Sequence, residues 1–265
     1  MTDSVLQQNL EEIVREAAAF MTREFDVTSK GTIANQVTSS DVAVENFLKE
    51  SLQTLLPGSS FIAEESDHGV KDAEYTWIID PIDGTANYVR DLGASGISVG
   101  LYKHMEPFIG VVYNPYRDEL FSARKGAGAF CNGRQIHVSD RDFAHSCFCT
   151  SLSCYYKNQG HASAQVLEQV FMQCDDFRRF GAAVIELTAL AAGRVELYFE
   201  MSLAPWDHGA SRVIIEEAGG CVANVYAPQI NYGGQTSFIA ANNPENLEKL
   251  RQIILQVAPQ RIEEE

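Results

Sequence analysis

The sequence has few basic residues and no long apolar run. Lysine and arginine together number 20, against 36 aspartates and glutamates, so the formal net charge at pH 7 is −16. Nucleic acids and anionic membrane surfaces attract basic patches, so this composition argues against both as partners. No stretch of about 18 apolar residues is present that could span a bilayer. If the substrate is an anion, a positive charge from outside the chain must attract it.

Cysteine motifs for zinc or redox chemistry are also missing. The six cysteines form no C-x-x-C pair and no Cys/His zinc spacing. Cys147 and Cys149 alternate within an apolar, strand-like run, which is typical of buried free thiols. The N-terminal residues lack the basic and apolar regions of a signal peptide. We therefore expect a cytoplasmic protein with reduced cysteines.

The apolar residues, 45% of the chain, follow helix and strand periods. Helical spacing predicts helices over 4–25 and 39–55, with Val5 on the buried face of the first and Val42 on that of the second. Strand patterns separated by turn residues then predict an antiparallel sheet built from 60–65, 75–80, 96–102, 107–113 and 119–126.

After about residue 140 the pattern changes to alternating strands and helices. The predicted strands are 145–152, 176–180, 194–200 and 237–242, and the predicted helices are 162–174, 182–193, 206–218 and one beginning at Pro244. We expect one catalytic domain, 1–265, with two packed halves. The first, about 1–140, combines helices with the antiparallel sheet, and the second, about 141–265, alternates α and β elements. This order predicts a layered architecture of the α+β or α/β class.

The stretch "WIIDPIDGTANYV" (77–89) holds two aspartates at the end of a strongly apolar strand. We expect Asp80 to be the last residue of the strand. Pro81 favours an extended backbone at the residue that precedes it, which is Asp80. Asp83 would then converge with Asp80, with the Ile82 carbonyl between them. Gly84 and Thr85 would open a helix whose free N–H groups can bind an anion. The alternative is an ordinary Asp-Gly turn.

Three further acidic positions and one lysine have simpler explanations when each is taken alone. Glu64 can be an exposed strand end, Asp207 a helix N-cap, Asp41 a first-turn acid, and Lys30 a surface lysine. Together, the acids would place four or five carboxylates beside one phosphate-sized pocket. Such a cluster requires a cation, and Mg²⁺ is the first choice because it takes oxygen ligands that it shares with phosphate.

Three motifs in this order resemble the inositol monophosphatase family of Mg²⁺-dependent, lithium-sensitive phosphatases. They are "AEES", "DPIDGTANY" and "WDHGASRVIIEEAGG", and the likeness runs from about Lys30 to Gly220. The resemblance implies a layered αβαβα sandwich, a homodimer, and two to three Mg²⁺ ions in each active site.

The resemblance also implies roles for individual residues. Glu64, Asp80 and the Ile82 carbonyl would bind the first metal ion, and Asp80, Asp83 and Asp207 the second. Glu64 would also hold a third, weaker ion. Catalysis would involve Glu64, Thr85, Asp41 and Lys30, with Thr85 and Asp41 orienting the attacking water. Substrate contacts would come from Asp83, Gly84, Thr85, Ala183, Glu200 and Asp207. One position departs from the family pattern: Asn35 stands where the family has an acid.

The expected activity is Mg²⁺-dependent hydrolysis of a small phosphorylated polyol, with myo-inositol 1-phosphate as the first choice. Direct attack by water is expected, because Phe180 breaks a C-x5-R motif after Cys174 and D-P-I-D-G-T is one residue longer than the D-x-D-G-T of aspartyl-phosphate enzymes. The alternatives are fructose 1,6-bisphosphate, 3′-phosphoadenosine 5′-phosphate, NADP or histidinol phosphate as substrate. A non-catalytic regulatory protein on the same fold is the other alternative.

Overall fold

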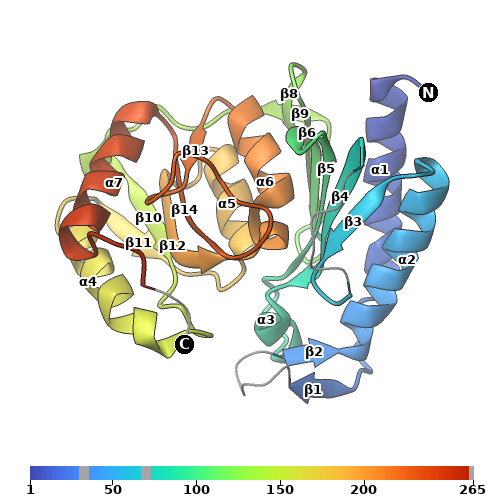
Figure 1. Ribbon diagram of the computed structural model, residues 1–265, viewed down its shortest axis with the longest axis horizontal. Helices are drawn as coiled ribbons and strands as arrows, with labels where there is room; N and C mark the ends of the chain where they lie inside the picture. The colour runs from blue at the N-terminus through green and yellow to red at the C-terminus, as the bar shows by residue number, and fades with distance from the viewer. Residues whose placement is uncertain (30–35, 67–72, 263–265) are drawn as a thin grey trace.

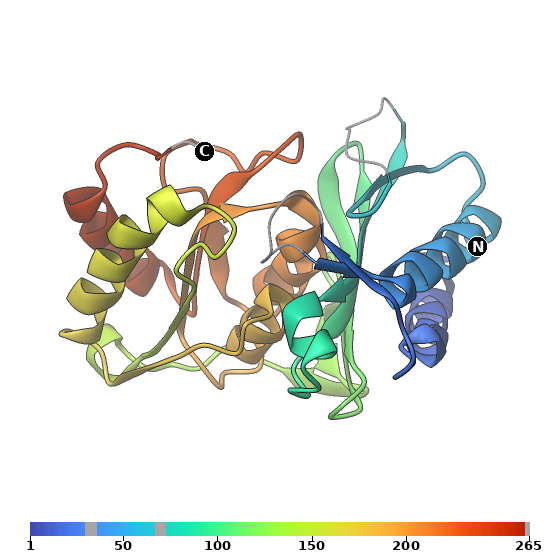
Figure 2. The ribbon, with the colours of Figure 1, turned by 90° about the horizontal axis from the view of Figure 1, so that it is seen from below.

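The computed structural model describes residues 1–29, 36–66 and 73–262. Lys30 and Asn35 therefore lie outside the described residues. The seven-stranded and five-stranded sheets alternate with layers of helices, and Figures 1 and 2 show helices on both outer sides and between the sheets. This arrangement confirms the predicted αβαβα sandwich.

The outer helices on one side are α1 (Asp3–Ala17) and α2 (Ser39–Leu55). They cover a seven-stranded sheet and bury Leu10, Val14 and Leu48 against it. The strand order is β3-β4-β5-β6-β7-β8-β9, and every neighbouring pair is antiparallel except β3 and β4. The strands are β3 (Ser60–Ala63), β4 (Tyr75–Asp83), β5 (Gly96–Lys103), β6 (Glu106–Asn114), β7 (Glu119–Arg124), β8 (Gly128–Cys131) and β9 (Arg134–Ile136).

The middle layer holds α5 (Ala183–Ala191) and α6 (Pro205–Glu217) between the two sheets (Figure 1). Helix α6 lies very close to the larger sheet. A Cβ atom added at Gly110 of β6 would stand 2.3 Å from the Ala210 carbonyl oxygen, so no other residue fits there without a shift of the helix. This close packing brings the first turn of α6 toward the end of β4.

The second sheet has five strands in the order β11-β10-β12-β14-β13, mixed parallel and antiparallel. They are β10 (Cys147–Thr150), β11 (Asp176–Arg178), β12 (Leu197–Leu203), β13 (Cys221–Ala223) and β14 (Thr236–Ala241). Helices α4 (Gly160–Phe171) and α7 (Pro244–Val257) cover its outer face (Figure 2). The remaining elements are the short helix α3 (Thr85–Val89), the ribbon of β1 (Val27–Ser29) with β2 (Gln36–Thr38), and 3-10 turns at Ala18–Phe20, Phe143–His145 and Lys157–Gln159.

Several predicted details were wrong. The first helix ends at Ala17, where a 3-10 turn takes over, and not at residue 25. Val5 and Val42 are exposed, because the buried stripes of their helices run through neighbouring positions. The strand expected to end at Asp80 continues to Asp83. No helix of the described residues has the length and apolar character that a membrane crossing needs.

Candidate active site

A bulge in β4 brings Asp80 and Asp83 to the same side of the sheet. Side chains three residues apart on a regular strand point to opposite faces. Here Asp80 pairs with Ser98 and Asp83 with Gly96, so β4 uses three steps where β5 uses two. The extra residue reverses the alternation. A β-bulge, and not the end of the strand, therefore makes the two carboxylates converge.

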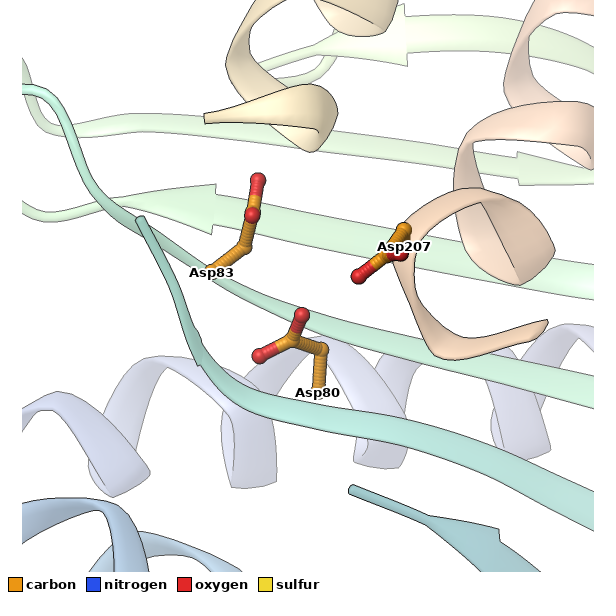
Figure 3. Close-up of side chains that lie close together, drawn as sticks. All are labelled: Asp80, Asp83 and Asp207. Atoms are coloured by element: carbon orange, nitrogen blue, oxygen red, sulfur yellow. The ribbon is translucent and has the colours of Figure 1, made fainter. Parts of the chain in front are cut away.

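Asp207 completes a cluster of three carboxylates. One oxygen from each of Asp80, Asp83 and Asp207 lies within 4.8 Å of the other two, and Figure 3 shows the three side chains turned toward one another. Asp80 is 1% exposed, and its Oδ1 is buried without a hydrogen-bond partner among the described residues. An unpaired buried carboxylate oxygen is costly unless a cation binds it. The geometry therefore fits a metal ion.

Main-chain groups from the second half of the chain hold the other two carboxylates. The Val184 N–H donates to Asp83 Oδ2 over 2.7 Å. The Ala204 N–H donates to Asp207 Oδ2, also over 2.7 Å. The sequence position of Asp207 suggested a helix N-cap. In the structure, Asp207 is instead the third residue of α6. Each hydrogen bond occupies one oxygen and leaves the other available to a ligand.

The cluster is electrostatically unfavourable without a cation. Burial raises the pKa of Asp80 well above its usual range, and the charges of Glu64, Asp83 and Asp207 raise it further. Burial and the charge of Asp207 also raise the pKa of Asp83, although the Val184 hydrogen bond opposes them. Burial raises the pKa of Asp207 to about 7. A divalent cation would reverse these shifts by stabilising the charged forms.

Thr85 lies between the carboxylate cluster and Asp41, a buried acid outside the cluster. Its hydroxyl lies 3.3 Å from Asp41 Oδ1 and 3.1 Å from the Ile82 carbonyl oxygen. Asp41, which is fully buried, accepts the Thr38 N–H at its other oxygen over 2.7 Å. Thr38 is the N-cap of α2, so a capping box holds Asp41 in place.

Gly84 makes the turn between β4 and α3 possible. Its φ of +80° is in the left-handed region, and a Cβ atom there would lie 2.8 Å from Ala182 Cβ. Its carbonyl accepts the Asn87 N–H over 2.8 Å and the Ser95 hydroxyl over 3.0 Å. The corner is therefore rigid and packed tightly against the segment that precedes α5.

A cavity of about 370 Å³ opens beside this corner. Its lining includes nearly all the predicted site residues: Glu64, Asp80, Ile82, Asp83, Gly84, Thr85, Ala183, Glu200 and Asp207. Asp41 lies behind Thr85 and does not line the cavity. Glu200 belongs to the part of the lining that comes from the second half of the chain. Burial raises the pKa of Glu200 to about 7, and a hydrogen bond with Ser151 opposes this shift.

A profile of known sequences matches residues 2–258 of the chain, and its description is the inositol monophosphatase family. The chain belongs to this family.

Relatives with two different names resemble this family member. The chain is 35% identical over 210 residues to Nus factor SuhB of Escherichia coli strain K12, covering 78% of both sequences. It is 34% identical over 230 residues to inositol monophosphatase 1 of Rattus norvegicus, covering 83% of this chain and 81% of the relative.

Solved structures of the family show the same fold. The extragenic suppressor protein suhB of Bartonella henselae superposes with a TM-score of 0.87 at 28% identity, over 94% of this chain and 98% of that one. The inositol monophosphatase of Anabaena superposes with a TM-score of 0.83 at 30% identity, over 97% of both chains.

Sequence reasoning missed some residues of this family member's cavity. Glu186, Arg179 and Tyr155 also line it. Glu186 had a readable signal, since it is the single charged residue in the apolar run of α5. Arg179 belonged to the predicted strand 176–180, but β11 ends at Arg178. Tyr155 lies on an irregular segment, where no periodic pattern marks an inward position.

A second cavity, of about 480 Å³, lies away from the carboxylate cluster. Its lining includes Arg117, Arg141 and Arg194. Arg117 and Arg194 pair with Glu119, and Arg141 pairs with the buried Glu196. The lining holds four arginines and four carboxylates, so these groups give it no net charge.

Proposed function

We propose that this family member is a Mg²⁺-dependent phosphomonoesterase acting on a small phosphorylated polyol, with myo-inositol 1-phosphate as the preferred substrate. The observation that carries the proposal is the carboxylate cluster of Asp80, Asp83 and Asp207, in which Asp80 Oδ1 is buried and has no hydrogen-bond partner in the part of the chain that the structure describes. The rat relative named inositol monophosphatase 1 supports the choice of substrate.

The residues present fit Mg²⁺. All the candidate ligand atoms are oxygens, as a hard divalent cation requires. Asp80, Glu64 and the Ile82 carbonyl would hold one ion, and Asp80, Asp83 and Asp207 a second, with Glu64 also serving a third. When bound, Mg²⁺ supplies Lewis-acid polarisation of the phosphate and lowers the pKa of a coordinated water.

Asp41 and Thr85 are proposed to orient the water that attacks phosphorus. When the Thr85 hydroxyl donates to Asp41 Oδ1, its oxygen lone pairs can accept a hydrogen bond from that water. Asp41 is held by Thr38 and cannot rotate away without losing the Thr38 N–H bond. The pair would therefore fix the direction of attack. Lys30 is also proposed to take part in catalysis.

The remaining cavity residues are proposed to bind the substrate. The main chain at Gly84 and Thr85, together with Asp83 and Asp207, would surround the phosphate. Ala183 and Glu200 would contact the polyol, with the Glu200 carboxylate accepting hydrogen bonds from substrate hydroxyls. Glu200 lines the same cavity as the cluster, which supports this division of roles.

The chain is proposed to work as one catalytic domain and as a homodimer in the cytoplasm. Asp80 and Asp83 come from the first half, whereas Asp207 and the Val184 N–H come from the second. A half expressed alone would lack part of the site. Sedimentation velocity of the full chain tests the homodimer, and a monomer at micromolar concentration would contradict it.

A phosphate-release assay tests the proposed activity. The panel contains inositol 1-phosphate, fructose 1,6-bisphosphate, 3′-phosphoadenosine 5′-phosphate, NADP and histidinol phosphate, each with Mg²⁺ and with EDTA. We expect Mg²⁺-dependent turnover with the highest kcat/KM on inositol 1-phosphate. Activity that persists in EDTA would refute the metal-dependent mechanism, and a higher kcat/KM on another compound would replace the substrate.

A second candidate function follows from the relatives named Nus factor SuhB. In this alternative the chain performs a Nus-factor role, either with or without catalysis. Turnover separates the alternatives. A chain that complements loss of SuhB equally well as wild type and as Asp83→Asn would have a function independent of phosphatase activity.

A further inference from the structure

Glu186 is a buried acid to which the proposed mechanism gives no role. It is 2% exposed and lies in the first turn of α5. Its Oε1 accepts the Phe180 N–H over 2.6 Å and the Gly181 N–H over 3.0 Å. Burying a carboxylate in an apolar layer is costly unless hydrogen bonds compensate it. The compensation here comes from one turn of the chain.

That turn, residues 180–182, packs directly on the Gly84 corner. Asn87 of α3 donates from Nδ2 to the Phe180 carbonyl over 2.7 Å and to the Ala94 carbonyl over 2.8 Å. On the other side, a Cβ atom at Gly84 would lie 3.4 Å from the Gly181 carbonyl oxygen and closer still to Ala182. Glu186 and Asn87 therefore hold the same peptide group, Phe180–Gly181, one at its N–H and the other at its carbonyl oxygen.

The same segment also orients a proposed metal ligand. Two residues after the turn, the Val184 N–H donates to Asp83 Oδ2. A shift of the turn would move both the main chain beside Gly84 and the donor that directs Asp83. Both groups belong to the proposed phosphate and metal site.

We propose that Glu186 is a positioning residue for the proposed phosphatase reaction. It holds the 180–182 turn, and the turn holds the Gly84 corner and the Asp83 carboxylate in their working geometry. The kinetic part of this inference rests on the proposed function, whereas the structural part does not. A displacement of the reacting groups by about 1 Å can lower the rate by about 100-fold. Loss of the hydrogen bonds to Glu186 should therefore slow catalysis.

Two substitutions at Glu186 distinguish the effect of its two accepted hydrogen bonds from the effect of its charge. Glu186→Ala removes the acceptor and should lower kcat/KM by about 100-fold. Glu186→Gln keeps an oxygen that can accept both N–H groups, so it should stay close to wild type. A Gln variant as impaired as the Ala variant would overturn the proposal, because the carboxylate charge would then matter and not the two hydrogen bonds.

Glu196 provides a matched control. It is also a buried carboxylate, 1% exposed, and it accepts the Cys147 N–H over 2.7 Å and the Ser139 hydroxyl over 2.9 Å. It does not line the cavity beside Asp80. Glu196→Ala should destabilise the fold without a comparable loss of kcat/KM in the folded fraction. Equal kinetic losses in both Ala variants would reduce Glu186 to a general stability role and overturn the proposal.

Two readouts do not depend on turnover. Hydrogen exchange measured with and without Mg²⁺ should show faster exchange across 180–184 in Glu186→Ala, but not in Glu186→Gln or Glu196→Ala. Calorimetric titration with Mg²⁺ should show weaker binding only in Glu186→Ala. If Glu186→Ala lowers activity while hydrogen exchange at 180–184 and Mg²⁺ binding stay unchanged, the proposed positioning role of Glu186 is refuted. A wild-type chain without phosphatase activity would refute the proposed function, and these readouts would still decide whether Glu186 holds the corner.

A double-mutant cycle tests whether Glu186 and Asn87 act through one turn. Asn87→Ala removes the donor to the Phe180 carbonyl. If both residues hold the same turn, the double variant should be little worse in kcat/KM than the worse single variant. Fully multiplicative losses would show independent effects and overturn the shared clamp.

Discussion

The Val184 N–H donates to Asp83 Oδ2 over 2.7 Å and so joins two segments 101 residues apart in the sequence. Asp83 comes from the strand that ends at the Gly84 corner, and Val184 from the helix between the two sheets. The bond occupies Asp83 Oδ2 and leaves Oδ1 available to a ligand. Packing between the halves of the chain therefore controls the geometry of the proposed metal site.

Asp83→Asn should lower the activity and raise the stability of the metal-free protein. Removing one of three clustered charges relieves repulsion, so the metal-free protein should melt at a higher temperature than wild type. Mg²⁺-dependent phosphate release should fall by about 100-fold or more, because a proposed Mg²⁺ ligand loses its negative charge. Differential scanning fluorimetry in EDTA and the phosphate-release assay measure the two effects.

Asp118→Asn is the control for that pair of changes. Asp118 is an exposed carboxylate that pairs with Arg15 and does not line the cavity. It should leave activity unchanged and should not stabilise the metal-free protein. A rise in melting temperature with Asp118→Asn as large as with Asp83→Asn would contradict the role of cluster repulsion.

The stability of the metal-free protein should fall as the pH rises through about 7. Burial raises the pKa of Asp207, Glu186 and Glu200 to about 7 in the folded protein, above their unfolded values. The folded state thus binds more protons than the unfolded state between the unfolded pKa values near 4 and the folded values. The stabilising effect is fully present below pH 4 and is lost as the pH rises through 7.

Mg²⁺ should change this pH profile. It binds the deprotonated carboxylates, so its stabilising effect should grow from about pH 5.5 to about pH 8. Melting temperatures measured across this range in EDTA and in millimolar Mg²⁺ check the prediction. A Mg²⁺-induced increase in melting temperature that is independent of pH would show that the buried acids do not bind the ion.

Gly84→Ala should both destabilise the protein and inactivate it. The new Cβ would meet Ala182 Cβ at 2.8 Å and the Ala94 carbonyl oxygen at 3.1 Å, in addition to the cost of a positive φ. Gly58 has a similar φ of +85° but no atom within 4 Å of an added Cβ. Gly58→Ala should therefore show only the backbone cost of about 1–2 kcal/mol in chemical denaturation, with unchanged activity. Equal effects of the two substitutions would mean that the contact with Ala182 has no importance.

Thr85→Val should lower kcat with little effect on KM, because it keeps the shape of the side chain and removes the hydroxyl beside Asp41. The expected loss is about 100-fold, the lower end of the range for positioned proton-transfer groups. Thr85→Ser retains the hydroxyl and should recover most of the rate. Steady-state kinetics at saturating Mg²⁺ measure both variants, and an inactive Ser variant would show that the methyl group, not the hydroxyl, is needed.

Glu200→Gln should change selectivity between substrates. The carboxylate is proposed to bind polyol hydroxyls, and hydrogen bonds to charged groups contribute about 1.5–3 kcal/mol, so kcat/KM for inositol 1-phosphate should fall about 10-fold or more. Hydrolysis of phenyl phosphate, which has no such hydroxyls, should change much less. An equal loss on both substrates would place Glu200 in the chemistry and not in recognition.

Patterns within single segments predicted most of the longer helices and strands and the chemistry of the site residues. The apolar period of α2 predicted its bounds, Ser39–Leu55, as the structure has them. The motif around Asp80 and Asp83 indicated the donor types of a magnesium site, and the order of the motifs indicated the family and the αβαβα layers. These features are local, because periodicity and short motifs report on one element at a time.

How those groups meet depends on contacts between distant segments. The bulge opposite β5 reverses the direction of Asp83 relative to Asp80, and strand register is a relation between two strands that neither shows alone. The close approach of α6 at Gly110 brings Asp207 to the cluster, and the turn held by Glu186 supports Gly84. Convergence depends on the packing between distant segments, which the pattern within any one segment does not encode.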